Sequence, residues 1–516
     1  MRRIKHFIAF TLVMVLLLTT VPVQAKEPEQ GLADVQEWQT GVYEKEEPEL
    51  IYPRKLAENA VYAYNSGSGL DSLSVDEKAS LFRNLEERIS DTLLAGKYVV
   101  DLTGVDMDYY TFLDIYSAGI IPYFGKGIRP YDFTEGECMN IINPFSEEET
   151  QELVNTINGR IAEIDNLITN EMTDAEKALA IHDYLIYRFE YDYDNYLNGT
   201  IPTESYQCSG LLMNGMGVCQ AYAMTYMYFM IREGIDCYVM SSSAMNHAWN
   251  IVNIDGSHYH VDCTWDDPVP DQFGKVRHSH FLVSDDKMQN ELDHYGWNRT
   301  DLVCDSTVYD NAYWTDINSQ IIGLNGPSYY IKGRAVWKKD GETEKELIQL
   351  GIWPVWESSG SYWTTAYSGL FWHDGYLYYN TYDKICRFSP DTMESEVVYE
   401  PDISEGYVYG IRDSGTEIEY IIKQSYQDEG MIYTAPVSLD ESDETPETPE
   451  YVLGDVDDSG NVNIADLRVV LRTVCGKVQL TEKQKLAADV VVDGNVDIED
   501  LRMLLRYICG KVDSFG

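Results

Sequence analysis

An internal duplication near the C-terminal end constrains the fold of this chain more than any other feature. The acidic segment 455–466 recurs 34 positions later as 489–500, and the apolar stretches 467–478 and 501–512 have the same spacing. Both stretches end in Cys-Gly-Lys-Val and have the apolar periodicity of a helix. The duplication therefore predicts a small all-helical module, residues 451–516, in which one loop-and-helix unit occurs twice.

The two loops have the ligand pattern of calcium-binding loops. Ca²⁺ takes six or more oxygen ligands, which such loops supply from alternate positions, and a glycine at position 6 allows the sharp turn. Position 3 of the second loop is Val491, which has no side-chain oxygen, so we expect the second site to bind Ca²⁺ more weakly. The predicted ligands are Asp455, Asp457, Ser459, Asn461 (through its carbonyl oxygen), Asn463 and Asp466 in the first loop, and Asp489, Asp493, Asn495, Asp497 and Asp500 in the second.

With two loops, a closing aspartate in each and one helix after each loop, this module resembles a type I dockerin. The resemblance implies structural Ca²⁺ and, as partner, a cohesin module of a scaffold protein in a cellulosome-like extracellular assembly. Proteins with dockerins usually serve polysaccharide degradation. Loop positions 10 and 11 commonly help to set the choice of cohesin in this family, and here they are Ile464, Ala465, Ile498 and Glu499.

A second chemical signal surrounds Cys219. Gly217 interrupts the preceding structure, and an apolar stretch runs from Cys219 to about residue 232, so the cysteine is expected in the first turn of a helix. The free amides and the dipole of a helix N-terminus stabilise a thiolate. The Cys219 backbone N–H would also point to where an acyl oxyanion forms.

An Asp255-Gly256 turn further along the chain predicts a hairpin that brings a histidine and a carboxylate together. A two-residue turn here places Asp262 opposite Trp249, and therefore diagonal to His247 on the same face. Diagonal Cβ atoms lie about 7 Å apart, within reach of the two side chains. Asp262 can then orient His247, and His247 can activate Cys219 for nucleophilic acyl transfer.

The order Cys, His, Asp, in the segments GVCQAYA, HAWNIV and VDCTWDD, resembles the transglutaminase-like superfamily. The resemblance implies a papain-like fold and thioester chemistry on amide bonds of proteins or peptides, by protease-like hydrolysis or by glutamine–amine crosslinking. It implies no cofactor for catalysis. It also implies a polar oxyanion-hole residue upstream of the cysteine, for which Gln207 is the first candidate and Tyr206 the second.

Three alternatives remain open at this point. His258, His260 and Asp262 alternate along one strand and could bind Zn²⁺. The Tyr/Trp-rich β region could make the chain a non-catalytic, scaffold-bound protein that binds carbohydrate or serves adhesion. A glycosidase is the weakest alternative, because we find no convincing pair of carboxylates for glycoside cleavage.

Bulk properties limit the partners and the location. With 86 acidic and 38 basic residues the net charge is −48, which argues against nucleic-acid binding because phosphates would be repelled. A charged start, an apolar run and the small-residue site Val23-Gln24-Ala25 predict a signal peptide that is cleaved after Ala25. No later apolar run is long enough for a transmembrane segment in the mature chain. The predicted location is extracellular, at a cell surface or scaffold. The nine cysteines are an odd number, and their pairing is left open.

The expected fold class is α+β multidomain, with a papain-like transglutaminase core, an all-β middle region and a small all-α, calcium-binding dockerin. A capping box at Thr173 and Glu176 predicts a helix at the start of the chemically informative part. The expected divisions are a signal peptide (1–25), a helical N-terminal extension (26–130), a transglutaminase-like domain (131–300), a β-rich region (301–437), an acidic Pro/Thr linker (438–450) and the dockerin (451–516).

Overall fold

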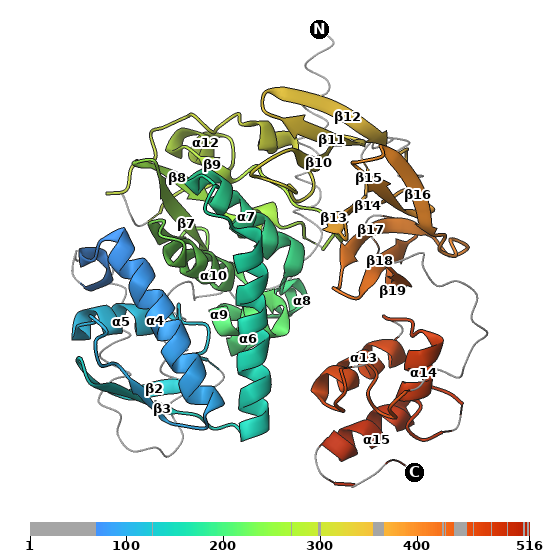
Figure 1. Ribbon diagram of the computed structural model, residues 1–516, viewed down its shortest axis with the longest axis horizontal. Coiled ribbons are helices and arrows are strands. Elements are labelled where there is room, and N and C mark those ends of the chain that lie inside the picture. The colour runs from blue at the N-terminus through green and yellow to red at the C-terminus, as the bar shows by residue number, and fades with distance from the viewer. Residues whose placement is uncertain are drawn as a thin grey trace, which may run out of the picture.

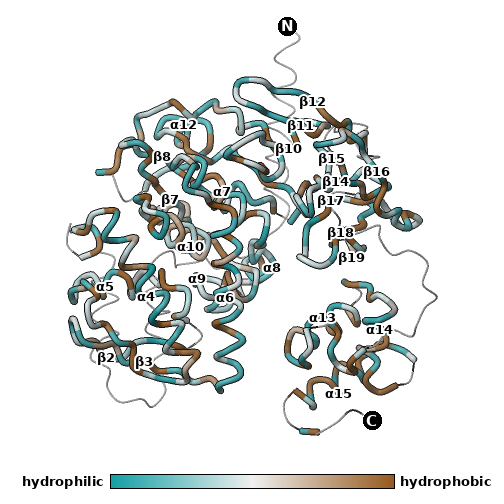
Figure 2. The backbone as a smooth tube through the Cα atoms, in the orientation of Figure 1, coloured by the Kyte–Doolittle hydropathy of each residue, from teal (hydrophilic) through white to brown (hydrophobic). Residues whose placement is uncertain are grey.

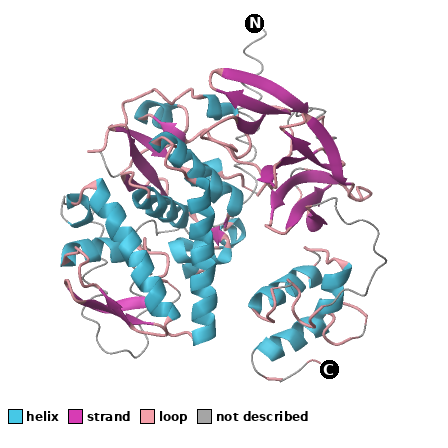
Figure 3. Ribbon diagram, in the orientation of Figure 1, coloured by secondary structure: helices cyan, strands magenta, loops and turns pink. Residues whose placement is uncertain are grey.

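The computed structural model describes residues 69–437 and 451–515, apart from gaps at 126, 270, 298–300, 354–365, 426–427, 429, 458, 476, 493, 509–510 and 513–514. The expected signal peptide and linker, and the predicted ligand Asp493, lie outside the described residues. The fold is mixed α+β, as predicted: helices dominate the N-terminal half, sheets the middle and helices the C-terminal end (Figures 1 and 3). Among the described residues, no helix is long and apolar enough to cross a membrane.

The N-terminal part combines helices with a small sheet. Helix α4 begins at a capping box between Ser74 and Glu77, and its apolar face is buried in the main hydrophobic core. The sequence predicts helices here, and the structure adds a sheet of order β1-β3-β2 that crosses residue 130. Its strands are short and mixed in polarity, so they give no clear alternating pattern. The elements are η1 (Gly69–Ser72), α4 (Val75–Leu94), β1 (Val99–Asp101), α5 (Tyr109–Ala118), β2 (Arg129–Thr134) and β3 (Cys138–Ile142).

Helix α7 confirms the predicted capping box, because the Thr173 hydroxyl accepts from the Glu176 backbone and the Glu176 carboxylate accepts from the Thr173 backbone. The longer helix α6 precedes it, and along it hydrophilic residues alternate with apolar ones, of which Leu153, Val154, Ile157, Ile161 and Ile164 are buried (Figure 2). Short elements then lead to the buried helix α10. The elements are α6 (Glu147–Leu167), α7 (Asp174–Arg188), β4 (Glu190–Tyr191), α8 (Tyr193–Asn198), η2 (Thr203–Tyr206), α9 (Cys208–Asn214) and β5 (Met216–Gly217).

Helix α10 (Cys219–Arg232) is buried along almost its whole length and packs on an antiparallel sheet of order β6-β7-β8-β9. The main core lies on the α10 side of this sheet. A smaller cluster around Met240, Trp249 and Cys304 covers other residues of the same strands. The elements are β6 (Cys237–Ser242), β7 (His247–Ile254), β8 (Ser257–Val261), α11 (Cys263–Asp266), β9 (Phe281–Val283) and α12 (Asp285–Asn290).

The middle region forms three antiparallel sheets, which confirms its predicted β character. It is joined to the preceding core by ion pairs and backbone contacts. Arg412 pairs with Glu190 at 3.2 Å, and Asp413 N donates to the Tyr187 hydroxyl at 2.9 Å. The elements are η3 (Tyr313–Asp316), β10 (Ser328–Lys332), β11 (Ala335–Asp340), β12 (Thr343–Gln349), β13 (Leu370–His373), β14 (Tyr376–Asn380), β15 (Ile385–Ser389), β16 (Glu394–Tyr399), β17 (Tyr407–Asp413), β18 (Glu417–Lys423) and β19 (Met431–Pro436).

The C-terminal module contains three helices, α13 (Ile464–Val474), α14 (Glu482–Ala488) and α15 (Ile498–Ile508). Helices α13 and α15 follow the two loops and pack against each other, as the duplication predicts. Helix α14 was not expected from the sequence. It has only seven residues and begins at a capping box between Thr481 and Gln484.

Candidate active site

Cys219 is the first residue of α10, which confirms its predicted place in the first helical turn. The cysteine is half-buried. The strand before it runs parallel to β4, and Val218 N donates to Ser205 O at 2.8 Å. A Cβ at Gly217 would lie 2.9 Å from both the Ala221 Cβ and a Leu211 methyl, closer than side chains approach. Only glycine therefore fits this turn into the helix.

The predicted hairpin is present with the predicted register. Asp255 and Gly256 have positive φ angles of 51° and 83°, as a two-residue turn of type I′ requires. Strands β7 and β8 pair from Ile254 opposite Ser257 to Asn250 opposite Val261. If this register continues by one residue, Asp262, which follows β8, lies opposite Trp249 and diagonal to His247 at the start of β7.

His247 begins β7 and meets Asp262 directly, with its Nε2 only 2.6 Å from Asp262 Oδ2. The residue before it, Asn246, has a φ of 50°, a left-handed conformation that asparagine tolerates better than most residues. This tight connection from β6 fixes where the strand begins. The imidazole is therefore placed by backbone geometry on one side and by a carboxylate on the other.

The surroundings of His247 favour its protonated form. Burial opposes the charge, but the Asp262 carboxylate, by attraction and hydrogen bonding, and a hydrogen bond with the Cys219 side chain outweigh it and raise the pKa of His247 to about 10. Because Nε2 faces Asp262, Nδ1 is the ring nitrogen left for the thiol. The rings of Trp249 and Trp265 lie 5.6 and 5.7 Å from the imidazole ring and restrict its rotation.

Asp262 is fully buried and contacts a second imidazole that sequence reasoning missed. His294 Nε2 lies 2.9 Å from Asp262 Oδ2, while Oδ1 accepts from the backbone N–H groups of Thr264 and Trp265. Burial alone would raise the pKa of Asp262, but the two imidazoles hold it far below its usual range. The His294 Nδ1 faces the Leu292 carbonyl at 2.9 Å, so both ring nitrogens of His294 face acceptors.

In the first loop of the C-terminal module, the predicted ligands come together. Carboxylate oxygens of Asp455, Asp457 and Asp466 lie within 4.8 Å of one another. Gly460 N donates to Asp455 Oδ2 at 2.8 Å, and Gly460 has the positive φ (87°) that the turn needs. Three converging carboxylates with like charge fit a divalent cation that prefers oxygen ligands, such as Ca²⁺.

Two regions of the chain match known families. Residues 162–263 match the transglutaminase-like superfamily, and residues 453–509 match the dockerin type I domain. The chain carries a transglutaminase-like core and a type I dockerin. No curated protein matches the chain. Among the solved structures that match, one described as "Crystal structure of a TGase" has 13% identity and a TM-score of 0.20, covers 32% of this chain, and is itself covered over only 49% of its length.

The oxyanion candidates of the transglutaminase-like core lie just upstream of Cys219. Gln207 precedes α9, and its carboxamide oxygen is 3.5 Å from the Ser209 hydroxyl. Tyr206 ends the turn η2. Burial, followed by the charges of Cys219, Tyr196 and Tyr206, raises the pKa of Tyr191. Tyr191 was not singled out from the sequence, since it lies among many tyrosines with no distinguishing motif.

The alternative zinc site does not assemble. His260 Nδ1 accepts from the Trp249 indole N–H at 3.0 Å, and its Nε2 lies 2.8 Å from Asp285. Asp262 instead contacts His247 and His294. Within the part of the chain that the structure describes, none of the converging groups of metal-ligating side chains includes His258. Asp285 orients His260, His260 accepts the indole N–H of Trp249, and the Trp249 ring stacks on the imidazole of His247.

The second dockerin loop repeats the geometry of the first where it is described. Gly494 N donates to Asp489 Oδ2 at 2.8 Å, and Gly494 has a φ of 88°. Val491 contributes only its backbone, whose N–H donates to Asp500 Oδ1 at 3.0 Å. Of the four predicted cohesin-contact residues, Ile464 and Ile498 are 41% and 48% exposed. Glu499 is also exposed and Ala465 is half-buried.

Proposed function

We propose that this chain is a secreted cysteine enzyme that acts on amide bonds of proteins or peptides by thioester acyl transfer, and that its dockerin attaches it to a scaffold. The observation that supports the proposal is the 2.6 Å contact of His247 with Asp262, together with the hydrogen bond of the Cys219 side chain that helps to raise the pKa of the same imidazole. A sulfur at a helix N-terminus and an oriented imidazole are the parts that nucleophilic catalysis on a carbonyl needs.

In the proposed reaction, the Cys219 thiolate attacks the carbonyl carbon of a substrate amide and forms a tetrahedral oxyanion. The Cys219 backbone N–H, with Gln207 as the candidate side chain, stabilises that oxyanion. His247 gives its proton to the leaving nitrogen as the C–N bond breaks, which releases an amine or ammonia and leaves a thioester. Asp262 holds the ring in the tautomer that this transfer requires.

The second half of the reaction decides the product. When water attacks the thioester, His247 accepts its proton and the carboxylic acid leaves with Cys219 restored. When an amine attacks, the same proton transfer gives a new amide, which is crosslinking. His294 assists both halves by keeping Asp262 charged, since it supplies a second hydrogen-bond donor to the same oxygen.

The dockerin supplies the location. The predicted ligands of both loops hold Ca²⁺, and the exposed residues at the starts of α13 and α15 contact a cohesin module. A predicted signal peptide and a dockerin are both consistent with an extracellular, scaffold-bound enzyme.

Activity profiling tests the proposal. Wild type and Cys219→Ser are compared on casein, on peptidoglycan peptides and on a glutamine–amine pair, with Cys138→Ser as a control because Cys138 is also half-buried. We expect turnover of at least one substrate that Cys219→Ser loses and Cys138→Ser keeps. A thiol probe that labels Cys219 no faster than Cys138, together with no turnover, would favour the non-catalytic binding protein instead.

A further inference from the structure

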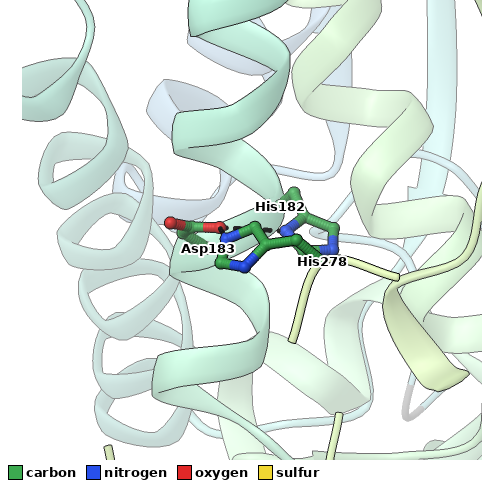
Figure 4. Close-up of side chains that lie close together, drawn as sticks. All are labelled: His182, Asp183 and His278. Carbon is green, nitrogen blue, oxygen red and sulfur yellow. Dashed lines mark hydrogen bonds and ion pairs between the residues drawn. The ribbon is translucent and has the colours of Figure 1, made fainter. Parts of the chain in front are cut away.

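A second group of charged side chains converges in the interior, apart from Cys219, His247 and Asp262. His182 and Asp183 lie on α7, and His278 lies in the segment before β9 (Figure 4). The Asp183 Oδ1 atom is 3.0 Å from His182 Nδ1 and 2.9 Å from His278 Nε2. All three side chains are almost completely buried, with exposures of 0%, 3% and 1% in sequence order. One oxygen and two nitrogens therefore face one another away from solvent.

The remaining polar atom of each side chain is held by another group. His182 Nε2 lies 3.2 Å from Asp266 Oδ2, and His278 Nδ1 lies 3.3 Å from the Ile317 carbonyl. Asp183 Oδ2 accepts from Ile321 N at 2.8 Å. Histidines that bind metals usually donate their second N–H to a carboxylate or a backbone carbonyl, which fixes the tautomer and the ring orientation. Because these second partners hold the other polar atom of each side chain, His182 Nδ1, Asp183 Oδ1 and His278 Nε2 are the three atoms that can bind a shared ligand.

Every ring nitrogen of His182 and His278 faces an acceptor, whereas a neutral imidazole has only one N–H to donate. A divalent ion bound by the two nitrogens that face Asp183 gives each of those nitrogens a partner while both rings stay neutral. Each ring then donates its one N–H outward, to Asp266 or to the Ile317 carbonyl.

We propose that His182 Nδ1, Asp183 Oδ1 and His278 Nε2 bind a divalent transition-metal ion of the zinc type. Two imidazoles and one carboxylate suit Zn²⁺, whereas Ca²⁺ prefers all-oxygen sites such as the dockerin loops. The rings of His182 and Phe281 lie 4.8 Å apart, so apolar side chains help to close the site.

The ion has a structural role in this proposal. It joins α7 to the segment that leads into β9, and through Ile317 and Ile321 it stabilises the start of the β-rich region. The site is distinct from the catalytic one, because the two groups have different carboxylates. Asp266, beside the proposed ion site, contacts His182 and His280, whereas Asp262 contacts His247 and His294.

Metal content of the full mature chain tests the proposal. The protein is stripped with a zinc chelator, loaded with Zn²⁺ in the presence of Ca²⁺, desalted and analysed by elemental mass spectrometry. We expect about one Zn²⁺ per chain in wild type, and at least tenfold weaker Zn²⁺ binding in Asp183→Asn and His278→Gln. Two controls should keep the zinc: His373→Gln, which changes a histidine of β13, and His247→Gln, which breaks the other buried His–Asp group.

The proposed zinc site would be refuted if wild type retained no zinc, or if Asp183→Asn retained as much zinc as wild type. Loss of zinc in His247→Gln instead of Asp183→Asn would also overturn it, because the ion would then belong to the catalytic group. If the cluster variants do not fold, Co²⁺ titration of wild type and His247→Gln decides. One equivalent of a visible absorption band in both supports the site, and its absence from wild type refutes it.

Discussion

Asp262 in the core and Asp466 in the dockerin are both buried carboxylates that organise a site, yet their charges are balanced in opposite ways. Burial opposes the charge of Asp262, but His247 and His294 hold its pKa far below the usual range. Burial raises the pKa of Asp466, backbone hydrogen bonds oppose this only in part, and the neighbouring charge of Asp457 adds to it. The core supplies its own imidazole partners for the buried carboxylate, whereas the carboxylates of the dockerin loop need a cation from outside.

Because of this difference, the core can assemble its site by folding alone, whereas the dockerin depends on a bound metal ion. In the core, folding alone brings the imidazole to the carboxylate and the thiol. In the dockerin, folding brings like charges together, so the free energy of metal binding becomes part of the folding free energy.

The largest expected effect tests whether the core is self-sufficient. Cys219→Ala and His247→Ala should each lower kcat/KM by about a thousandfold or more, since the thiol and imidazole act as one unit. The measurement is turnover of whichever substrate the profiling identifies, with Cys138→Ser as the matched control. A loss of less than about tenfold in His247→Ala would show that the imidazole does not activate the thiol.

Removing calcium should act on the dockerin alone. A calcium-selective chelator should abolish cohesin binding and shift the dockerin transition in a calorimetric scan to a lower temperature, because the converging carboxylates of Asp455, Asp457 and Asp466 then repel one another. Turnover by the core should change little, and added Ca²⁺ should restore binding. Unchanged cohesin affinity in the chelator would contradict the proposed calcium sites.

His294→Gln sharpens the account of the core. The variant removes one of two imidazole donors to Asp262, and we expect kcat to fall about tenfold with KM nearly unchanged, since a hydrogen bond to a charged group contributes about 1.5–3 kcal/mol. The control is His258→Gln, a histidine of the same sheet that does not contact Asp262. Equal kcat values for the two variants would remove His294 from the proposed site.

Val491→Asp tests whether the missing side-chain oxygen at position 3 weakens Ca²⁺ binding by the second dockerin loop. A carboxylate at position 3 should raise the Ca²⁺ affinity of the second loop about tenfold, because it adds a charged ligand. Asp457→Val in the first loop is the matched reverse change and should weaken that loop. Calorimetric titration resolves the two sites, and two equal sites in wild type would disagree with the expected difference.

The smallest effect is in the pH dependence of stability, and it has opposite signs in the two regions. The raised pKa of His247 gives stability that is complete below about pH 6.5 and is lost as the pH rises through about 10. The raised pKa of Asp466 means that the calcium-free dockerin gains stability as the pH falls from neutral toward that pKa.

Thermal scans measure both contributions. The difference in Tm between wild type and His247→Gln should shrink by a few degrees between pH 6.5 and 10. Without calcium, the dockerin transition should move up on acidification, and Asp466→Asn should remove that shift. A wild-type advantage that grows with pH would contradict the charge pairing of His247.

Local rules in the sequence predicted the parts of the site that depend on short-range geometry. The Asp255-Gly256 turn sets the register by itself, so the approach of His247 to Asp262 followed from counting residues. The helix start at Cys219 and the capping box at Thr173 are local in the same sense.

Residues brought together by tertiary packing could not be predicted. His294 lies 32 positions after Asp262, in a segment without a regular pattern. His182 looks like an ordinary polar residue of an amphipathic helix, and His278 lies 95 positions from Asp183. Only the packing of α7 against the segment before β9 makes them neighbours. The sheet β1-β3-β2 was missed because its strands are too short to show an alternating pattern.

The contacts between the core and the residues that follow it bear on how this protein can be cut for expression. Trp314, Ile317 and Ile321 lie in the same hydrophobic core as α7 and α10, and Ile321 N donates to the buried Asp183. A fragment that stopped near residue 300 would expose that apolar surface and leave a carboxylate oxygen without its donor. Recombinant pieces that keep the thiol chemistry therefore have to extend through the β-rich region. The dockerin in turn contacts that region, since Ile432 of β19 exchanges backbone hydrogen bonds with Lys477 and Gln479.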